Sequence, residues 1–465
     1  MRPREQLALG LIALIATACN IENEGDAPPR ATLYFPNALG LLHDDPDAAA
    51  RHLLVTNSNF DLRYNAGTLQ AYDLAELGDA VAGCVEQGDE DCELEPGEFL
   101  ADEIHIGSFS NGLAIAPGRD RAFVASRTDK SLSVIELDPA SDDDIFTCGD
   151  GLRGCTRAAD LGEDPETGKA VKEWIGDPVV IMTRPMSDWL PGRDDLGDYV
   201  MVGHLDGEIS LFTQGLDDDG GLLDRFQLTG VLERVNPQLT GLAFDDTTGQ
   251  VHLSFATVVP TNRGKGINRV AVSVPDRVLD SGEAVPDTAR ARIFSTGVLV
   301  LEGVGPRTDT RDIEFIAAPE PEPRALVLAR EPNALLLADL DETRNRDGVG
   351  RVLRTAVLGS GPSRMVVAEL PREGDALRVA VVSCFTAREI FVVDLETMLI
   401  RTVVPNLSGP FDLAVDEERS LLYVTDFRSS VIRIIDLSPL TDPDAGEGAS
   451  VVATLGAPRI IQELQ

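Results

Sequence analysis

A hairpin pattern recurs along this chain and constrains its fold more than any other feature. The stretch 421–437, LLYVTDFRSSVIRIIDL, is an apolar run, a polar loop and a second run that closes on an acidic residue and Leu. The same spacing is found without gaps at 121–137, 198–214, 324–340 and 379–395. Longer copies, with insertions in the polar loop, occupy 53–74 and 251–274. Such patterning is typical of β-hairpins, so the sequence predicts seven of them.

Further apolar segments extend each hairpin into a larger unit. Several hairpins follow a strand-like segment, found at 111–117, 240–246, 362–369 and 409–416. Fourth strands are expected at 398–404 and 450–455. The period runs from about 42 to about 75 residues, which is typical of four-stranded propeller blades with insertions. The longest insertions are expected at about 75–104, 139–178 and 276–310.

These units predict an all-β fold, a seven-bladed β-propeller with four-stranded antiparallel blades over residues 32–465. The competing class is a chain of βαβ units with a parallel sheet. It is disfavoured because no amphipathic helix of 10–15 residues lies between the strand-like runs. The segment 32–35, TLYF, is expected to complete the last blade and close the ring.

The first residues predict an export signal and a lipid anchor. Arg2 and Arg4 precede a twelve-residue apolar run that ends in Ala16, Thr17 and Ala18, followed by Cys19. As a helix this run would span about 18 Å, too short for a bilayer. The pattern predicts a signal peptide over 1–18, with small residues before the cut. Cleavage near Ala18 of an ordinary signal peptide is the alternative to lipidation.

The same segment resembles a bacterial lipobox, which implies lipidation of Cys19 and a membrane tether over 19–31. It departs from that pattern at Ala16, where Leu is usual. The resemblance implies a protein exported to the cell envelope, anchored in the outer membrane and facing the periplasm or the surface.

The other cysteines agree with an oxidising compartment. Cys84 and Cys92 flank one short polar segment, and Cys148 and Cys155 flank another, so two local disulfides are expected. Cys384 lies within an apolar run and is expected to be a buried thiol. Neither pair has the spacing of a zinc site.

Charge excludes some partners. The chain carries 78 acidic and 40 basic residues, a formal net charge of −38. Such a surface repels nucleic acid and anionic lipid, so no nucleic-acid partner is expected, and the membrane is expected to be reached only through the anchor.

The strand segments YVTD and LLVTN, each followed by a turn and a VIxxxDL-like strand, resemble the YVTN family of β-propeller repeat proteins. The resemblance covers roughly residues 32–456. It implies the propeller fold, and its superfamily ranges from surface-associated binding proteins to lactonase-like enzymes. Because the motif is structural, it does not select one of these functions.

In propellers of this kind the loop between the second and third strands shares a face with the link into the first strand. The candidate binding face comprises Arg127, Asp129, His204, Asp206, Arg330, Arg388, Asp426 and Arg428. The same loops hold Asn57, Asn59, Ser126 and Cys384, and the links add Asn111, Arg311, Ser363, Arg364 and Asp412. The arginines predict an anion-binding mouth, because the guanidinium fork matches a carboxylate. Solvated polar turns are the simpler interpretation.

A metal site is the second possibility on this face. Asn57, Asp206 and Asp426 are weak candidates for ligands of a central calcium. The acidic loops 138–144 and 217–224 also gather carboxylates, although neither matches an EF-hand. The five histidines are scattered, and no CxxCH, GxSxG or P-loop motif is found. No catalytic residue is predicted.

The sequence therefore predicts a lipid-anchored β-propeller that acts as a binding or scaffold module for a protein, a polysaccharide or a small ligand, rather than an enzyme. The rival hypothesis is a lactonase-like hydrolase with a divalent cation in the central channel. A structural role in a surface assembly, with 139–178 as the contact, is a third.

Overall fold

The computed structural model describes residues 25–459 apart from fifteen short gaps. The gaps are 46–47, 89–91, 129–130, 149–176, 206, 218, 233–242, 245–256, 261–265, 280, 305–308, 317–323, 341–347, 373 and 443–447. The predicted signal peptide, Cys19, Asp129, Cys155 and Asp206 thus lie outside the described residues. Within those residues no helix is long and apolar enough to cross a bilayer.

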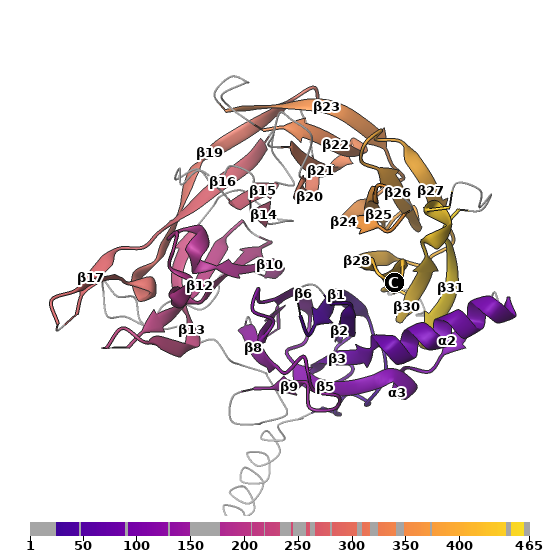
Figure 1. The fold of residues 1–465 in the computed structure, drawn as a ribbon, viewed down its shortest axis with the longest axis horizontal. Helices are drawn as coiled ribbons and strands as arrows, with labels where there is room; N and C mark the ends of the chain where they lie inside the picture. Colours follow the sequence, from indigo (N-terminus) through magenta and orange to yellow (C-terminus); the bar gives the residue numbers. More distant parts are fainter. Residues whose placement is uncertain are drawn as a thin grey trace, which may run out of the picture.

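Antiparallel sheets stand side by side around a ring, which is the arrangement of a β-propeller (Figure 1). The first sheet holds β1 (Pro36–His43), β2 (Ala50–Asn57), β3 (Gly67–Asp73) and β5 (Leu100–Ile106). The second holds β6 (Ser110–Ile115), β7 (Arg121–Ser126), β8 (Ser131–Leu137) and β9 (Phe146–Thr147). The third holds β10 (Pro178–Pro185), β11 (Asp198–His204), β12 (Ile209–Leu216) and β13 (Leu222–Leu232).

The chain continues into an eight-stranded sheet and two further blades. The eight strands are β14 (Ala243–Phe244), β15 (Thr257–Pro260), β16 (Gly266–Ser273), β19 (Arg292–Glu302), β20 (Asp309–Ile316), β21 (Arg324–Glu331), β22 (Asn333–Asp339) and β23 (Val349–Val357). The next sheet holds β24 (Pro362–Leu370), β25 (Leu377–Cys384), β26 (Glu389–Asp394) and β27 (Ile400–Val404). The last holds β28 (Pro410–Asp416), β29 (Leu421–Asp426), β30 (Val431–Asp436), β31 (Ser450–Leu455) and β4 (Glu93–Leu94).

A few smaller elements decorate the ring. Strands β17 (Asp276–Val278) and β18 (Ala284–Pro286) form a separate hairpin within the predicted insertion 276–310. The helices are α2 (Leu74–Gln87) and α3 (Pro96–Phe99), with single 3₁₀ turns η1 (Met186–Asp188), η2 (Asp194–Leu196), η3 (Thr288–Arg290) and η4 (Ser438–Leu440). The 14-residue helix α2 contradicts the expectation that no amphipathic helix lies between the strand-like runs, because it buries Leu74, Leu77 and Val81 on one face.

The structure indicates six blades, so the prediction of seven separate blades is wrong. The difference comes from β19 and β23, which pair in parallel through Val300 and Val349 and their neighbours. This pairing joins two runs of four strands, β14–β19 and β20–β23, into one sheet. The hairpin spacing cannot reveal it, because it links the outer strands of two successive repeats.

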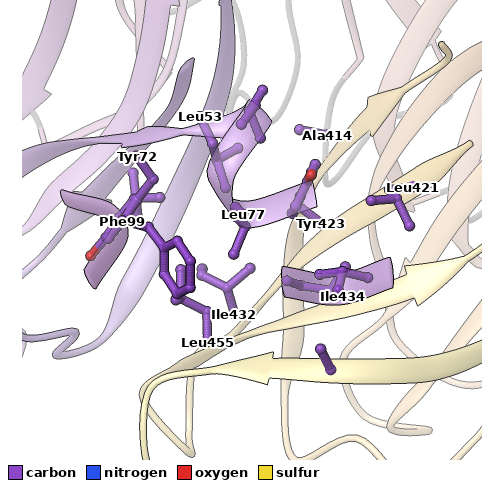
Figure 2. Packing of buried hydrophobic residues seen from close by; sticks show 14 of the residues in the cluster. Leu53, Tyr72, Leu77, Phe99, Ala414, Leu421, Tyr423, Ile432, Ile434 and Leu455 are labelled. Carbon is purple, nitrogen blue, oxygen red and sulfur yellow. The ribbon is translucent and has the colours of Figure 1, made fainter. Parts of the chain in front are cut away.

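The predicted hairpins form strands because their apolar residues face the neighbouring sheets. In β29 all six residues are buried, and β29 pairs with β30 from Leu421 opposite Asp436 to Asp426 opposite Val431. One apolar cluster lies between the first sheet, α2 and the last sheet, and contains Leu53, Leu77, Tyr423 and Leu455 (Figure 2). Burial of such side chains against the adjacent blade holds successive sheets together.

The ring closes differently from the prediction for 32–35. That segment is not a strand, and β1 begins at Pro36. Instead β4, from the insertion that follows β3, adds in parallel to β31 of the last sheet. The backbone N–H of Thr454 donates to the carbonyl of Cys92 at 2.9 Å, and that of Gly456 donates to Leu94 at 2.9 Å. An insertion of the first blade therefore clasps the last one.

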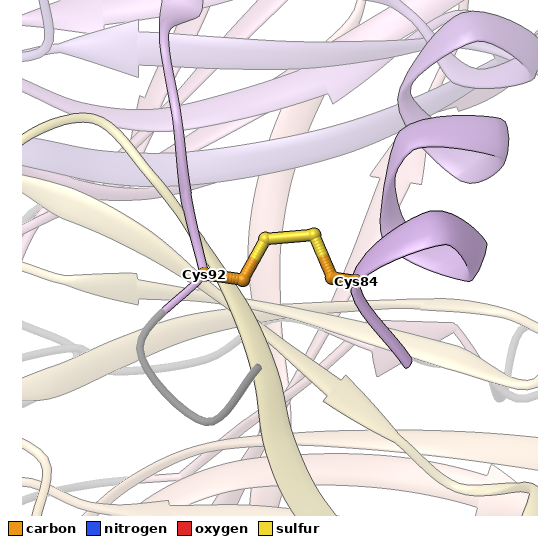
Figure 3. Close-up of a disulfide and its surroundings, with 2 residues drawn as sticks. All are labelled: Cys84 and Cys92. Carbon is orange, nitrogen blue, oxygen red and sulfur yellow. A yellow bond between two sulfur atoms is a disulfide. The ribbon is translucent and has the colours of Figure 1, made fainter. Parts of the chain in front are cut away.

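A disulfide ties this clasp to α2. Cys84 in α2 is bonded to Cys92, as predicted, so β4 is held beside the helix (Figure 3). The helix starts at an Asp73 side chain that accepts from the N–H groups of Ala75 and Glu76, and ends at Gly88 in the left-handed conformation. Cys148 is also disulfide-bonded, and Cys384 is a buried free thiol, as expected.

We expect loss of the Cys84–Cys92 disulfide to loosen the clasp. Replacement of both cysteines by Ala should lower the free energy of unfolding by about 2–3 kcal/mol, because the unfolded chain gains conformational entropy when this short loop is no longer closed. Chemical denaturation without reductant measures the change. Hydrogen exchange at Thr454 should also quicken, since its N–H bonds to Cys92. Unchanged exchange at Thr454 would contradict the clasp.

Candidate functional site

One backbone hydrogen bond defines the same position in five repeats. In each, the first residue after the second strand donates its N–H to the carbonyl of the residue that precedes the first strand. The pairs are Ser58 to Phe35, Arg127 to Phe109, Leu205 to Asp177, Phe385 to Gly361 and Phe427 to Gly409. The loops and the links thus lie on one face of the ring, as the sequence analysis expected.

Six of the sixteen phenylalanines of the chain lie in contact on this face. We call Phe35, Phe60, Phe109, Phe385, Phe411 and Phe427 the phenylalanine belt. Phe60 is central, with ring centroids 5.0 Å from Phe109 and 5.4 Å from Phe427. From Phe427 the belt continues through Phe411 to Phe385, with centroids 6.4 Å apart at each step. Tilted and edge-to-face pairs at these distances attract one another.

The belt lines a cavity of about 270 Å³. Its walls are the five rings of Phe60, Phe109, Phe385, Phe411 and Phe427, joined by Asn37, Ser58, Ser110, Asn111 and Arg127. The lining comes from four neighbouring parts of the ring, because β24 contacts β28, β28 contacts β1, and β1 contacts β6. A mostly apolar cavity with a few polar groups is the usual form of a small-ligand site.

The backbone around the cavity is held in unusual conformations. Phe35 and Phe109 each have a φ of about 52°, a left-handed region that is rare for bulky residues. Asn59, at a φ of 49°, fastens the loop that carries Phe60. Its side-chain nitrogen donates to the carbonyl of Tyr64 at 2.7 Å and to the Ser108 hydroxyl at 2.8 Å. Strain that the surroundings maintain in this way is often found at binding sites.

Three arginines lie against rings of the belt. The guanidinium carbons of Arg127, Arg364 and Arg428 are 5.9, 5.6 and 4.8 Å from the centroids of Phe109, Phe411 and Phe385, respectively. Arg127 also pairs with Asp177 at 2.6 Å. Cations at these distances are attracted by the ring faces.

The remaining predicted face residues are not brought together. Arg388 is exposed and has a φ of 63°. His204 is buried, with its Nε2 2.9 Å from the Ser210 hydroxyl. Arg330 is the next-to-last residue of β21 and does not line the cavity. Among the described residues of the predicted face and its links, Arg127 and Asn111 line the cavity, and Arg364 and Arg428 lie against rings that do.

Two of the candidate calcium ligands are engaged by their own neighbours. Asn57 is buried, and its amide nitrogen donates to Thr68 at 3.0 Å and to Gln70 at 2.8 Å. Asp426 is fully buried and accepts from the N–H groups of Ser408 and Gly409 at 3.0 and 2.6 Å. It also accepts from Arg433 at 3.3 Å.

The acidic loops show local turn contacts. Asp217 accepts from the N–H groups of Asp219 and Gly221, and Asp138 accepts from that of Ala140. In the described part of the chain, no group of three or more His, Cys, Asp or Glu side chains is placed to hold a metal. Asp206, the third candidate ligand, lies in a gap.

We expect Asp426 to act in stability. Asp426→Asn should lower the free energy of unfolding by about 2–4 kcal/mol. Arg433 would lose its ion-pair partner, and the new amide would have too few acceptor atoms for the N–H groups of Ser408 and Gly409. Asp195→Asn is the matched control, since Asp195 pairs with Arg193 at 2.8 Å on the exposed surface. It should cost less than about 1 kcal/mol. A wild-type unfolding midpoint that fell in EDTA would favour a bound cation instead.

Half-buried carboxylates connect the inner strands. Asp412 on β28 accepts from the N–H of Leu39 on β1 at 2.8 Å, and Asp312 on β20 accepts from that of Met365 on β24 at 3.1 Å. Burial raises the pKa of Asp312 to about 6 and also raises the pKa of Asp412, while Arg364 opposes both shifts. These acids join neighbouring sheets.

The phenylalanines of the belt were missed by the sequence analysis, which weighed only polar loop residues. A signal was present. In the ungapped repeats the residue after the second strand is Phe in 379–395 and 421–437, and Arg127 in 121–137. Phe60 and Phe411 could not be found in this way, because Phe60 lies two residues further along its loop and Phe411 lies within β28.

Comparisons with known proteins leave the family open. No family model matches the chain, and no curated protein matches it. Among solved structures, Kuenenia stuttgartiensis hydrazine synthase has 10% identity and a TM-score of 0.46, covering 88% of this chain and 97% of its own. The Myceliophteria thermophila Cps50 (Swd1) β-propeller domain has 9% identity and a TM-score of 0.47, with coverages of 86% and 96%.

A third structure, the Dos1 propeller, has 9% identity and a TM-score of 0.38, covering 75% of this chain and 72% of its own. Similarities this distant carry no inference about activity. The resemblance to YVTN proteins stays a prediction. The sheets themselves identify the class, a β-propeller, and this fold is consistent with a binding or scaffold module.

Proposed function

We propose that this protein is a lipid-anchored binding module of the cell envelope, and that its ligand enters the cavity lined by the phenylalanine belt. The observation that carries the proposal is the convergence of five phenylalanine rings on one cavity of about 270 Å³. Because aromatic residues are only 5% of the chain, this concentration on one face is notable. Apolar rings gathered around an open cavity favour a ligand with an apolar or aromatic group.

The preformed geometry supports binding over a purely structural role. Phe60 remains 38% exposed although it contacts three other rings of the belt. A packing residue would gain by full burial, whereas a binding residue keeps a free face. The loop of Phe60 is fastened by Asn59, so little ordering would be required when a ligand binds.

We expect Phe60→Ala to weaken binding of a neutral aromatic probe. In a ¹⁹F NMR titration with 4-fluorophenylacetamide, the affinity should fall about tenfold, because the probe loses a ring contact. Phe294→Ala is the matched control, since Phe294 is 39% exposed on the outer strand β19. It should leave the affinity unchanged. Failure of the wild-type protein to bind the probe would contradict the proposed pocket.

The lipid anchor is tested separately. Cells that express the full chain should carry the wild-type protein in the membrane fraction, whereas Cys19→Ser should release it, because the lipidated sulfur is lost. Immunoblots of the fractions measure the change. A Cys19→Ser protein that stayed with membranes would overturn the anchor and leave the pocket proposal untouched.

A further inference from the structure

Arg428 is a cation held at the edge of the cavity with no ion-pair partner among the described residues. Its side chain is exposed, and its guanidinium carbon lies 4.8 Å from the centroid of Phe385, a ring that lines the cavity. By contrast, Arg401, Arg419 and Arg433 each pair with a carboxylate. On a chain with 78 acidic residues, an arginine left free beside a cavity is available for an anion.

The local backbone keeps Arg428 on the ring. A Cβ atom at Gly409 would lie 3.0 Å from both the Arg428 Cγ and the Phe385 Cε2. Glycine therefore leaves the space in which the arginine stem lies beside the phenylalanine. Among the described residues the guanidinium donates no hydrogen bond, so its N–H donors remain available beside a ring that lines the cavity.

The cavity wall also contains a hydroxyl with no partner. Ser110 lines the cavity and is 1% exposed, and its Oγ makes no hydrogen bond within the described structure. Ser126, its neighbour across the β6–β7 pair, has an unpartnered Oγ as well. Because buried polar groups are nearly always hydrogen-bonded, such a group in a cavity wall points to a ligand atom.

We propose that the ligand is a small aromatic carboxylate. Its ring would lie among the phenylalanines, and its carboxylate would accept from the Arg428 guanidinium at the rim, while Ser110 would bond a polar atom deeper in the cavity. Arg127 in the same wall is neutralised by its pair with Asp177, but that bond uses only one of its five N–H donors. A cavity of about 270 Å³ accommodates one small molecule of this kind. This inference rests on the proposed function.

The test compares two probes of the same shape. In ¹⁹F NMR titrations of the full-length mature protein, 4-fluorophenylacetate should bind about threefold to tenfold tighter than 4-fluorophenylacetamide, because only the acetate forms a charge-assisted bond with Arg428. Arg428→Gln should remove this preference and retain the binding of the amide. In competition with the fluorinated acetate, Ser110→Ala should weaken binding of 4-hydroxyphenylacetate about threefold, because its hydroxyl is the polar atom that Ser110 would bond. Arg351→Gln, at an exposed position of β23, is the charge-matched control and should change neither affinity.

Each outcome decides one claim. Equal affinity of the wild-type protein for both probes would overturn the carboxylate preference and keep the pocket. A preference that survived in Arg428→Gln would overturn the role of Arg428. Binding of neither probe would overturn both the inference and the proposed function. Circular dichroism and the unfolding midpoint of each variant show that a loss of binding is not a loss of folding.

Discussion

Closure of the ring between the last sheet and the first is the constraint on which this structure depends. A propeller buries the faces of its sheets only if each sheet has a neighbour on both sides. Three kinds of contact make the closing junction: the apolar cluster around Leu53 and Tyr423, the bond from the Leu39 N–H to Asp412, and the pairing of β4 with β31. The clasp adds backbone hydrogen bonds to an outer strand that would otherwise present a free edge.

The candidate site lies across this same junction. Phe411 and Phe427 belong to the last sheet, whereas Phe35 and Phe60 flank the first strands of the chain. Phe35 is also tied to the last sheet directly, because its N–H donates to the Ser430 hydroxyl at 3.1 Å. The cavity therefore exists only when the ring is closed. Any change that loosens the clasp is expected to disturb the phenylalanine belt as well.

Charge has two distinct roles on the binding face. Asp426, with its buried bonds to Ser408, Gly409 and Arg433, holds a loop in place, and Asp412 joins two sheets. These acids are structural, although the sequence presents them as surface candidates. Arg428 differs because its neighbours are a phenylalanine ring and a glycine. Residues of the same loop thus serve folding or binding according to their depth.

The sequence by itself determined the hairpins and the propeller class of the fold. Alternating apolar residues around polar turns place the hairpins, and the repeated spacing predicts a ring of antiparallel sheets, because local patterning controls which faces must be buried. Likewise, Cys84 and Cys92 lie close enough in sequence for their disulfide to be expected. The common face of loops and links also followed from strand direction.

Only the tertiary structure decided the number of sheets, the means of closure and the site. β19 pairs in parallel with β23, and β4 pairs in parallel with β31. No local sequence pattern predicts either pairing, because the paired segments are distant in the chain. The phenylalanine belt gathers residues from the two ends of the chain, and each ring alone resembles an ordinary loop residue. Their proximity depends on long-range packing, which a sequence read one segment at a time does not contain.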